Sequence, residues 1–242
     1  MNFNRILIVH GEPNSIFLEV LFKYFKLKSF KKNNSIIILI GNKKLIYKQM
    51  KKLGYNFYIN QINDIKKATK KEINLININY KFKKTFSKIS SLSNKYIENS
   101  FRKALNIIKL YKISKLINGP ISKKYFLKNK YQGVTEYISK KFKIKNFSML
   151  IYNKDLSVSP ITTHLPISKV SKNIEKKIII SKVLLISDFY KKYFFKKPKI
   201  AITGLNPHCE NFFKLSEETK IIKPAIKVLK NKKIDVENLK FI

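Results

Sequence analysis

The sequence predicts an α/β fold built on a mostly parallel sheet flanked by helices. Short, wholly apolar runs rich in isoleucine, leucine and valine are typical of strands that are buried on both faces. These runs alternate with longer segments whose apolar residues recur at helical spacing, as in chains of β-α-β units. The chain has 242 residues, which is enough to bury a sizeable core in one large domain or two small ones.

Six apolar runs are expected to form the strands: residues 5–9, 35–40, 75–78, 147–152, 156–161 and 199–203. Six periodic segments are expected to form the helices: residues 15–28, 42–53, 93–113, 135–143, 174–195 and 216–231. Several of these helices start at Ser, Asn or Thr, whose side chains commonly cap helix N-termini. Residues 60–91 are polar and irregular, which predicts an inserted loop or a junction between lobes. After residue 231 we expect neither a closing helix nor a further strand.

The composition is strongly basic, because 52 lysines and arginines stand against 14 acidic residues and give a net charge of +38. Only Arg5 and Arg102 are arginines, although arginine is the residue that grips phosphates and guanine edges bidentately. The lysines are spread along the chain with many asparagines and isoleucines. We therefore favour a compositional bias over a functional basic face, and expect only non-specific binding of nucleic acid. A lysine-rich RNA-associated protein remains an alternative function.

The cellular location expected from the sequence is the cytoplasm. Cys209 is the single cysteine, so the chain cannot form an internal disulfide, and no Cys/His cluster has the spacing of a zinc finger. No apolar run approaches the roughly 18 residues that span a bilayer. The apolar stretch at residues 6–9 is too short for a secretory signal.

Four loops that follow apolar strands carry the residues suited to chemistry, because ligands of open α/β sheets bind at the carboxyl ends of strands. They are residues 10–15, 118–123, 162–166 and 204–210. His164 and His208 both lie just beyond a strand, and two imidazoles there could ligate one metal ion, although a third ligand is needed. The alternative for each is an ordinary hydrogen-bonding loop histidine, which is also our interpretation of His10. Lys123 near a helix start suits an anionic group.

Several enzyme classes are disfavoured by missing motifs. The chain lacks the Gly-x-Ser-x-Gly elbow of serine hydrolases, the phosphate-binding P-loop and the Gly-x-Gly-x-x-Gly dinucleotide fingerprint. A nucleophilic pair of His208 and Cys209 is disfavoured because adjacent side chains on an extended segment point to opposite sides.

The ordered set of loops resembles one family, the 4-hydroxythreonine-4-phosphate dehydrogenases of vitamin B6 biosynthesis. The matching stretches run through nearly the whole chain: Gly-Glu-Pro at 11–13, Asn-Gly-Pro-Ile-Ser-Lys at 118–123, Gly-Val-Thr-Glu-Tyr at 133–137, Thr-Thr-His-Leu-Pro at 162–166 and Gly-Leu-Asn-Pro-His at 204–208. A weaker match starts at Glu218.

The resemblance implies a two-lobed subunit of the isocitrate/isopropylmalate dehydrogenase-like architecture, in a homodimer with the site at the subunit interface. It implies NAD or NADP as cofactor and a divalent metal such as zinc, magnesium or cobalt. His164 and His208 match the first two metal ligands of the family. Thr135 matches a residue that holds the substrate. Lys123 lies in the family's Gly-Pro loop, where a cation suits the anionic substrate.

The activity that the resemblance implies is a metal-assisted, NAD(P)-dependent oxidation of 4-phosphohydroxy-L-threonine. The 3-keto acid that forms loses carbon dioxide to give 3-amino-2-oxopropyl phosphate. The metal lowers the pKa of the substrate hydroxyl while hydride leaves the same carbon atom for the nicotinamide.

The sequence also departs from the family pattern. Val134 replaces the histidine of a substrate-binding His-Thr pair, and residues 14–17 and 211–213 replace glycine-rich stretches. Residues 1–242 match roughly the N-terminal three quarters of a family subunit without a linker-bounded domain. The C-terminal part of the family's subunits, which carries the third metal-binding histidine, has no counterpart in residues 1–242. A truncated, non-catalytic remnant of the family is therefore the second candidate function.

Overall fold

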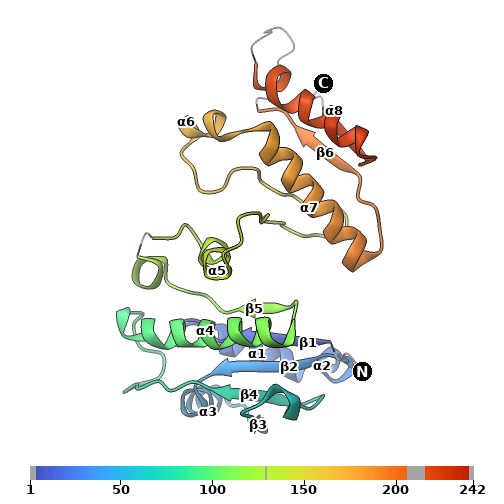
Figure 1. Ribbon diagram of the computed structural model, residues 1–242. Helices are drawn as coiled ribbons and strands as arrows, with labels where there is room; N and C mark the ends of the chain where they lie inside the picture. The colour runs from blue at the N-terminus through green and yellow to red at the C-terminus, as the bar shows by residue number, and fades with distance from the viewer. Residues whose placement is uncertain (1–3, 129, 206–215, 240–242) are drawn as a thin grey trace. The chain divides into compact units, whose positions relative to one another are not determined.

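The computed structural model describes residues 4–128, 130–205 and 216–239 (Figure 1). The chain divides into two compact units, unit 1 (Met1–Tyr137) and unit 2 (Ile138–Ile242).

The described part of unit 1 is built on a five-stranded sheet in the order β3-β4-β2-β1-β5. The strands are β1 (Arg5–Val9), β2 (Ile36–Gly41), β3 (Ile59–Gln61), β4 (Ile73–Asn77) and β5 (Leu116–Asn118). Each pairing is parallel, and the register sets Leu7 opposite Ile38 on one side and Leu116 on the other. Every residue of β2 is buried, as expected for a central strand covered on both faces. The predicted fold class is therefore confirmed.

The helices of unit 1 cover opposite faces of this sheet. They are α1 (Phe17–Lys26), α2 (Lys28–Lys32), α3 (Lys43–Lys52) and α4 (Asn94–Tyr111). The chain moves one way across the sheet from β1 to β2 and the other way from β4 to β5. Right-handed crossovers therefore place α1 and α4 on different faces. Figure 1 shows α4 lying along the sheet.

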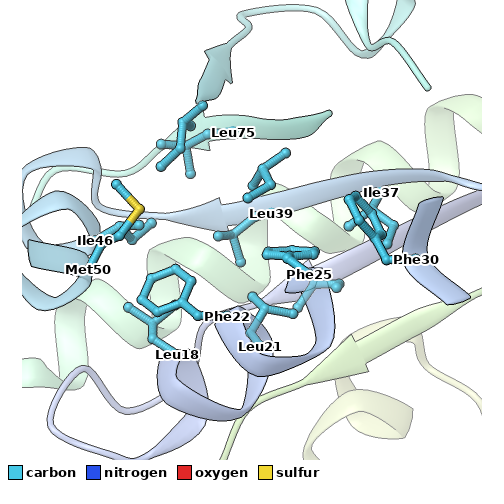
Figure 2. Packing of buried hydrophobic residues seen from close by; sticks show 13 residues of the cluster. Leu18, Leu21, Phe22, Phe25, Phe30, Ile37, Leu39, Ile46, Met50 and Leu75 are labelled. Atoms are coloured by element: carbon cyan, nitrogen blue, oxygen red, sulfur yellow. The ribbon is translucent and has the colours of Figure 1, made fainter. Parts of the chain in front are cut away.

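The main core of unit 1 lies between one face of the sheet and the helices α1, α2 and α3. Figure 2 shows Phe22 and Phe25 of α1 beside Leu39 of β2, with Met50 of α3 nearby. Phe22 and Leu39 are fully buried. Burial of such side chains supplies the main stabilisation, at about 1.5–3 kcal/mol for each one.

A buried hydrogen-bond chain joins the carboxyl ends of β1 and β2 to α4. His10 follows β1 and is fully buried, and its Nδ1 lies 2.9 Å from Oη of Tyr96 in α4. The same oxygen accepts the backbone N–H of Asn42 at 3.2 Å. Burial lowers the pKa of His10 to about 3, which keeps its imidazole neutral. This contact agrees with the interpretation of His10 as a hydrogen-bonding residue.

Two glycines allow the ends of β1 and β5 to meet. Gly11 adopts a φ of +75°, the left-handed region that favours glycine. A Cβ atom on Gly119 would lie 2.0 Å from the carbonyl oxygen of His10. The backbone of the β5 loop therefore packs directly on that of the β1 loop.

Unit 2 has its own smaller core. Its elements are α6 (Ile167–Val170), α7 (Lys176–Phe194), β6 (Ile200–Thr203), α8 (Lys223–Asn231) and β7 (Val236–Leu239), while α5 (Val134–Phe142) spans the boundary between the units. Strands β6 and β7 pair in parallel. Ile179 and Val183 of α7 pack with Ala225 and Leu229 of α8.

Several expected elements differ in the structure. Residues 147–152 and 156–161 were predicted as strands, but they form only an isolated antiparallel bridge between Ile151 and Val158. Both of these side chains are more than half exposed. The expected helix over 15–28 is interrupted at Leu27, whose ψ of 144° is extended and separates α1 from α2.

The remaining differences are short strands that the sequence analysis missed. Within residues 60–91, β4 agrees with the strand predicted at 75–78, most of β3 was not predicted, and the connections 62–72 and 78–90 are largely irregular. The expectation of no strand after residue 231 was wrong, because β7 pairs with β6. Strand β5 was also outside the predicted set. Short strands gain their stability from partners distant in sequence, which local periodicity does not record.

No helix in the described part of the chain is long and apolar enough to cross a membrane.

We predict that His10 makes the folded protein acid-sensitive. The unfolded histidine takes up its proton near pH 6.5, whereas the folded one stays neutral until about pH 3. Between these values the unfolded state binds more protons, so the free energy of unfolding falls as the pH falls, by up to about 1.4 kcal/mol per pH unit. Urea unfolding from pH 7 to pH 4.5 should show a shallower pH dependence for His10→Gln. Parallel profiles for the two proteins would contradict the prediction.

We also predict that Gly119→Ala destabilises unit 1, because a backbone atom and not a mobile side chain occupies the space of the new methyl group. The free energy of unfolding in urea should fall by about 2–3 kcal/mol. Gly54→Ala is the control without a steric clash, since nothing lies within 4 Å of its added Cβ, and its cost comes from the positive φ of +70° that Gly119 does not share. The free energy of unfolding of Gly54→Ala should fall by about 1 kcal/mol. Equal losses at both positions would refute the steric explanation.

Candidate functional site

The carboxyl ends of β1 and β5 form one edge of the parallel sheet, and their loops are fixed against each other. The backbone N–H of Gly119 donates to the carbonyl oxygen of Val9 at 2.8 Å. The N–H of Glu12 donates to the carbonyl oxygen of Pro120 at 2.8 Å. Ligands of open α/β sheets bind at this edge, so the two loops form a rigid base for a site.

Glu12 is a buried carboxylate in a very basic chain, and neutral groups hold it. Its side chain is 1% exposed, and its Oε2 accepts a hydrogen bond from Oγ of Ser93 at 2.7 Å. Its Oε1 accepts the N–H of Asn14 at 3.2 Å. Ser93 directly precedes α4, whose N-terminal end carries a positive potential that favours an anion. No ion pair involves Glu12 within the described ranges.

The sequence analysis included residues 11–13 in the resemblance but assigned no role to Glu12 or Ser93. The available signal was a lone acidic residue in the first loop of a basic sequence. Ser93 lies 81 residues further along the chain, so the pairing itself could not be predicted from local sequence.

Lys123 begins a short helical segment after β5, η3 (Lys123–Leu127). Ser122 caps this segment, because its Oγ accepts the N–H of Tyr125 at 3.1 Å. The Lys123 side chain is exposed, so its ammonium group is available to an anion.

Thr135 is the second residue of α5, and its side chain is exposed. Two positions later, Tyr137 is buried and packs edge to face on Phe101 of α4 and Phe126 of η3, with ring centroids 5.4 and 5.3 Å apart. Burial raises the pKa of Tyr137 to about 12, so its hydroxyl stays protonated at neutral pH. The structure therefore packs the segments that carry Lys123 and Thr135 on the same helix.

His164 lies in unit 2, in the loop before α6, and its imidazole is exposed. Its φ of +58° is left-handed, a conformation that is uncommon for residues other than glycine. Most such residues in helical chains lie at helix C-termini, whereas His164 precedes a helix. Strained backbone of this kind concentrates at functional sites.

His208 falls in residues 206–215, outside the described residues, so the structure describes one of the two candidate metal ligands. Across residues 4–128, 130–205 and 216–239, no group of three or more His, Cys, Asp or Glu side chains could hold a metal ion. Lys123 and Thr135 belong to unit 1 and His164 belongs to unit 2.

Glu218 is a further buried carboxylate in unit 2, at the start of η5 (Glu218–Ile222). Its Oε1 accepts the N–H of Leu205 at 2.9 Å. This bond ties the start of the loop after β6 to the segment that leads into α8.

Comparisons with known proteins identify the family. The model of the family described as pyridoxal phosphate biosynthetic protein PdxA matches residues 32–239. A 4-hydroxythreonine-4-phosphate dehydrogenase from Sulfurihydrogenibium is 35% identical over 239 residues, which cover 96% of this chain and 72% of that protein. The enzyme of the same name from Aquifex aeolicus is 30% identical, over 96% of this chain and 72% of the relative.

The fold agrees with solved structures. The crystal structure of a 4-hydroxythreonine-4-phosphate dehydrogenase from Burkholderia phymatum matches with a TM-score of 0.83 at 22% identity, over 100% of this chain and 75% of that one. The corresponding structure from Klebsiella pneumoniae also gives 0.83, at 19% identity, over 98% of this chain and 75% of that one. The family model matches most of the chain, and the relatives match nearly all of it. The chain therefore belongs to the family of pyridoxal phosphate biosynthetic proteins PdxA.

Proposed function

We propose that the protein is an oxidoreductase of pyridoxal phosphate biosynthesis that oxidises 4-phosphohydroxy-L-threonine. The substrate hydroxyl loses its proton and the same carbon atom gives hydride to NAD or NADP. The 3-keto acid then releases carbon dioxide and leaves 3-amino-2-oxopropyl phosphate. The observation that carries the proposal is the family match over residues 32–239, together with relatives named for this activity.

The proposed metal ligands are His164 and His208. Imidazole suits divalent ions such as zinc and cobalt, and the exposed His164 side chain on its left-handed backbone supports the role. When bound, a divalent ion supplies Lewis-acid chemistry that lowers the pKa of the substrate hydroxyl. One described imidazole does not by itself make a metal centre, so the assignment depends on both histidines and further oxygen or nitrogen donors.

The proposed substrate contacts are Thr135 and Lys123. The Thr135 hydroxyl lies in the first turn of α5, where outward-facing backbone N–H groups also favour an anion such as a phosphate. The exposed ammonium of Lys123 complements the same negative charge. The protein is proposed to work in the cytoplasm as a homodimer with the site at the subunit interface.

The activity is tested by reduction of NAD or NADP with 4-phosphohydroxy-L-threonine and added zinc, magnesium or cobalt. We expect turnover by the wild type and a loss of about a hundredfold or more for His164→Ala and for His208→Ala, because the metal would lose a ligand. Circular dichroism should show that His164→Ala folds like the wild type, since the side chain is exposed. Folded wild-type protein without turnover under every cofactor and metal condition would contradict the proposal and favour the non-catalytic alternative.

Substrate contacts are tested by calorimetric binding of 4-phosphohydroxy-L-threonine. Lys123→Met and Thr135→Val should each weaken binding by roughly tenfold or more, because each removes a hydrogen bond to a charged group. Lys124→Met is the matched control, since Lys124 is the adjacent exposed lysine and lies over the ring of Tyr125, 5.4 Å from its centroid. Equal losses for Lys123→Met and Lys124→Met would show that general charge, and not Lys123 itself, binds the substrate.

A further inference from the structure

One surface of unit 1 combines lysines and aromatic rings from two segments that lie apart in the sequence. Lys48 of α3 lies over the ring of Phe82, 5.4 Å from its centroid, and Lys52 of α3 lies over the ring of Phe86 at 5.8 Å. Both rings belong to the irregular connection 78–90, so this connection runs beside α3. We call the surface the α3 face and define it by Tyr47, Lys48, Lys51, Lys52, Phe82 and Phe86.

The α3 face has no acidic residue near it in sequence. Between Glu19 and Asp64, and again between Glu72 and Glu98, the chain contains no aspartate or glutamate. Elsewhere in the described ranges some lysines are paired, as Lys177 is with Glu175 at 2.8 Å. Within the described part of the chain, the lysines of the α3 face form no ion pair. Their positive charge therefore remains available to an external anion.

The α3 face is also hollowed. Tyr47, Lys48 and Lys51 line a shallow depression of about 540 Å³ together with Tyr55. Tyr47 is 37% exposed, and Lys43 lies over its ring at 6.0 Å. The depression therefore offers an aromatic wall beside at least two ammonium groups.

Phe86 is presented to solvent at a conformational cost. Its φ of +58° is left-handed, which is rare for a bulky residue, and its side chain is 42% exposed. The next residue is anchored, because the N–H of Ser87 donates to Oδ1 of Asn14 at 3.0 Å. The connection thus holds a large apolar ring that keeps 42% of its surface exposed.

We propose that the α3 face binds single-stranded nucleic acid, with phosphates on Lys48, Lys51 and Lys52 and bases stacked on Phe86 and Tyr47. Lysines that contact successive phosphates of a nucleic-acid strand release the counterions bound there, and exposed aromatic rings stack on any base. An acidic protein or an anionic lipid surface would also contact the lysines, but neither repeats an anionic group beside a flat ring as a nucleic-acid strand does. Because lysine and stacking do not read base edges, the binding is independent of sequence. This activity is additional to the dehydrogenase function and does not depend on it.

The charge component is tested with the full chain and a fluorescein-labelled oligoribonucleotide of about 20 nucleotides, by anisotropy at several salt concentrations. The variant Lys48→Gln/Lys51→Gln/Lys52→Gln should bind roughly a hundredfold more weakly at about 0.1 M salt, with a salt slope smaller by about 2. The matched control is Lys95→Gln/Lys103→Gln/Lys115→Gln, which removes equal charge from exposed positions on and after α4. It should change the affinity by less than about threefold. Equal losses in both variants would overturn the proposal, since diffuse charge alone would then explain binding.

The stacking component is tested with Tyr47→Ala/Phe86→Ala. Binding should weaken by roughly tenfold or more while the salt slope stays unchanged, because no charge is removed. Circular dichroism and thermal melting check that the fold is retained. A DNA strand of the same sequence should show the same dependence on both variants. Wild-type affinity in the aromatic variant would overturn the proposal, and so would equally tight binding of anionic vesicles or polyglutamate.

Discussion

The structure of unit 1 depends on how closely the backbones of β1 and β5 approach each other beyond their last paired residues. Only glycine fits at residue 119, because the carbonyl of His10 occupies the space where a side chain would begin. This contact brings the polar groups of the β1 loop into a buried interior, where most polar groups are hydrogen-bonded. Tyr96 bonds His10 and Ser93 bonds Glu12, so α4 is fixed to the same edge. The steric fit of two glycines thereby determines where a helix and two loops lie.

The predictable part of the fold is the part whose signal is local. Residues 5–9 and Asn42 illustrate this, because the apolar run forms β1 as expected, and Asn42 caps α3 by accepting the N–H of Leu45 at 2.9 Å. The run at 147–152 is also largely apolar but lies partly exposed, since apolar residues form a strand only where a sheet provides partners. For the site, the position of His164 in a loop could be predicted, but the strand at 156–161 that was expected to precede it does not form. The contact between Glu12 and Ser93 depends on tertiary packing and could not.

The chemistry proposed for the protein draws on residues from both units. Unit 1 holds the exposed Lys123 and Thr135 on segments that pack on α4, whereas unit 2 holds His164. The fixed segments that carry Lys123 and Thr135 and the exposed imidazole of His164 suit different tasks. Substrate charge is best met by groups on fixed elements, and a metal ligand needs an accessible lone pair. The lysine-rich α3 face adds an electrostatic surface to unit 1, built from residues that neither of these tasks uses.

The short sheet of unit 2 has a consequence for solubility. Within the described residues β6 and β7 pair only with each other, so each presents a row of unpaired backbone groups that another chain could extend. Lysine is the residue with which proteins commonly protect such edges, and Lys196, Lys197 and Lys199 precede or flank β6. Mutual repulsion between copies that each carry +38 adds to this protection. Concentrated salt shortens the range of that repulsion to about 3 Å at 1 M, so colloidal stability in this protein is tied to ionic strength.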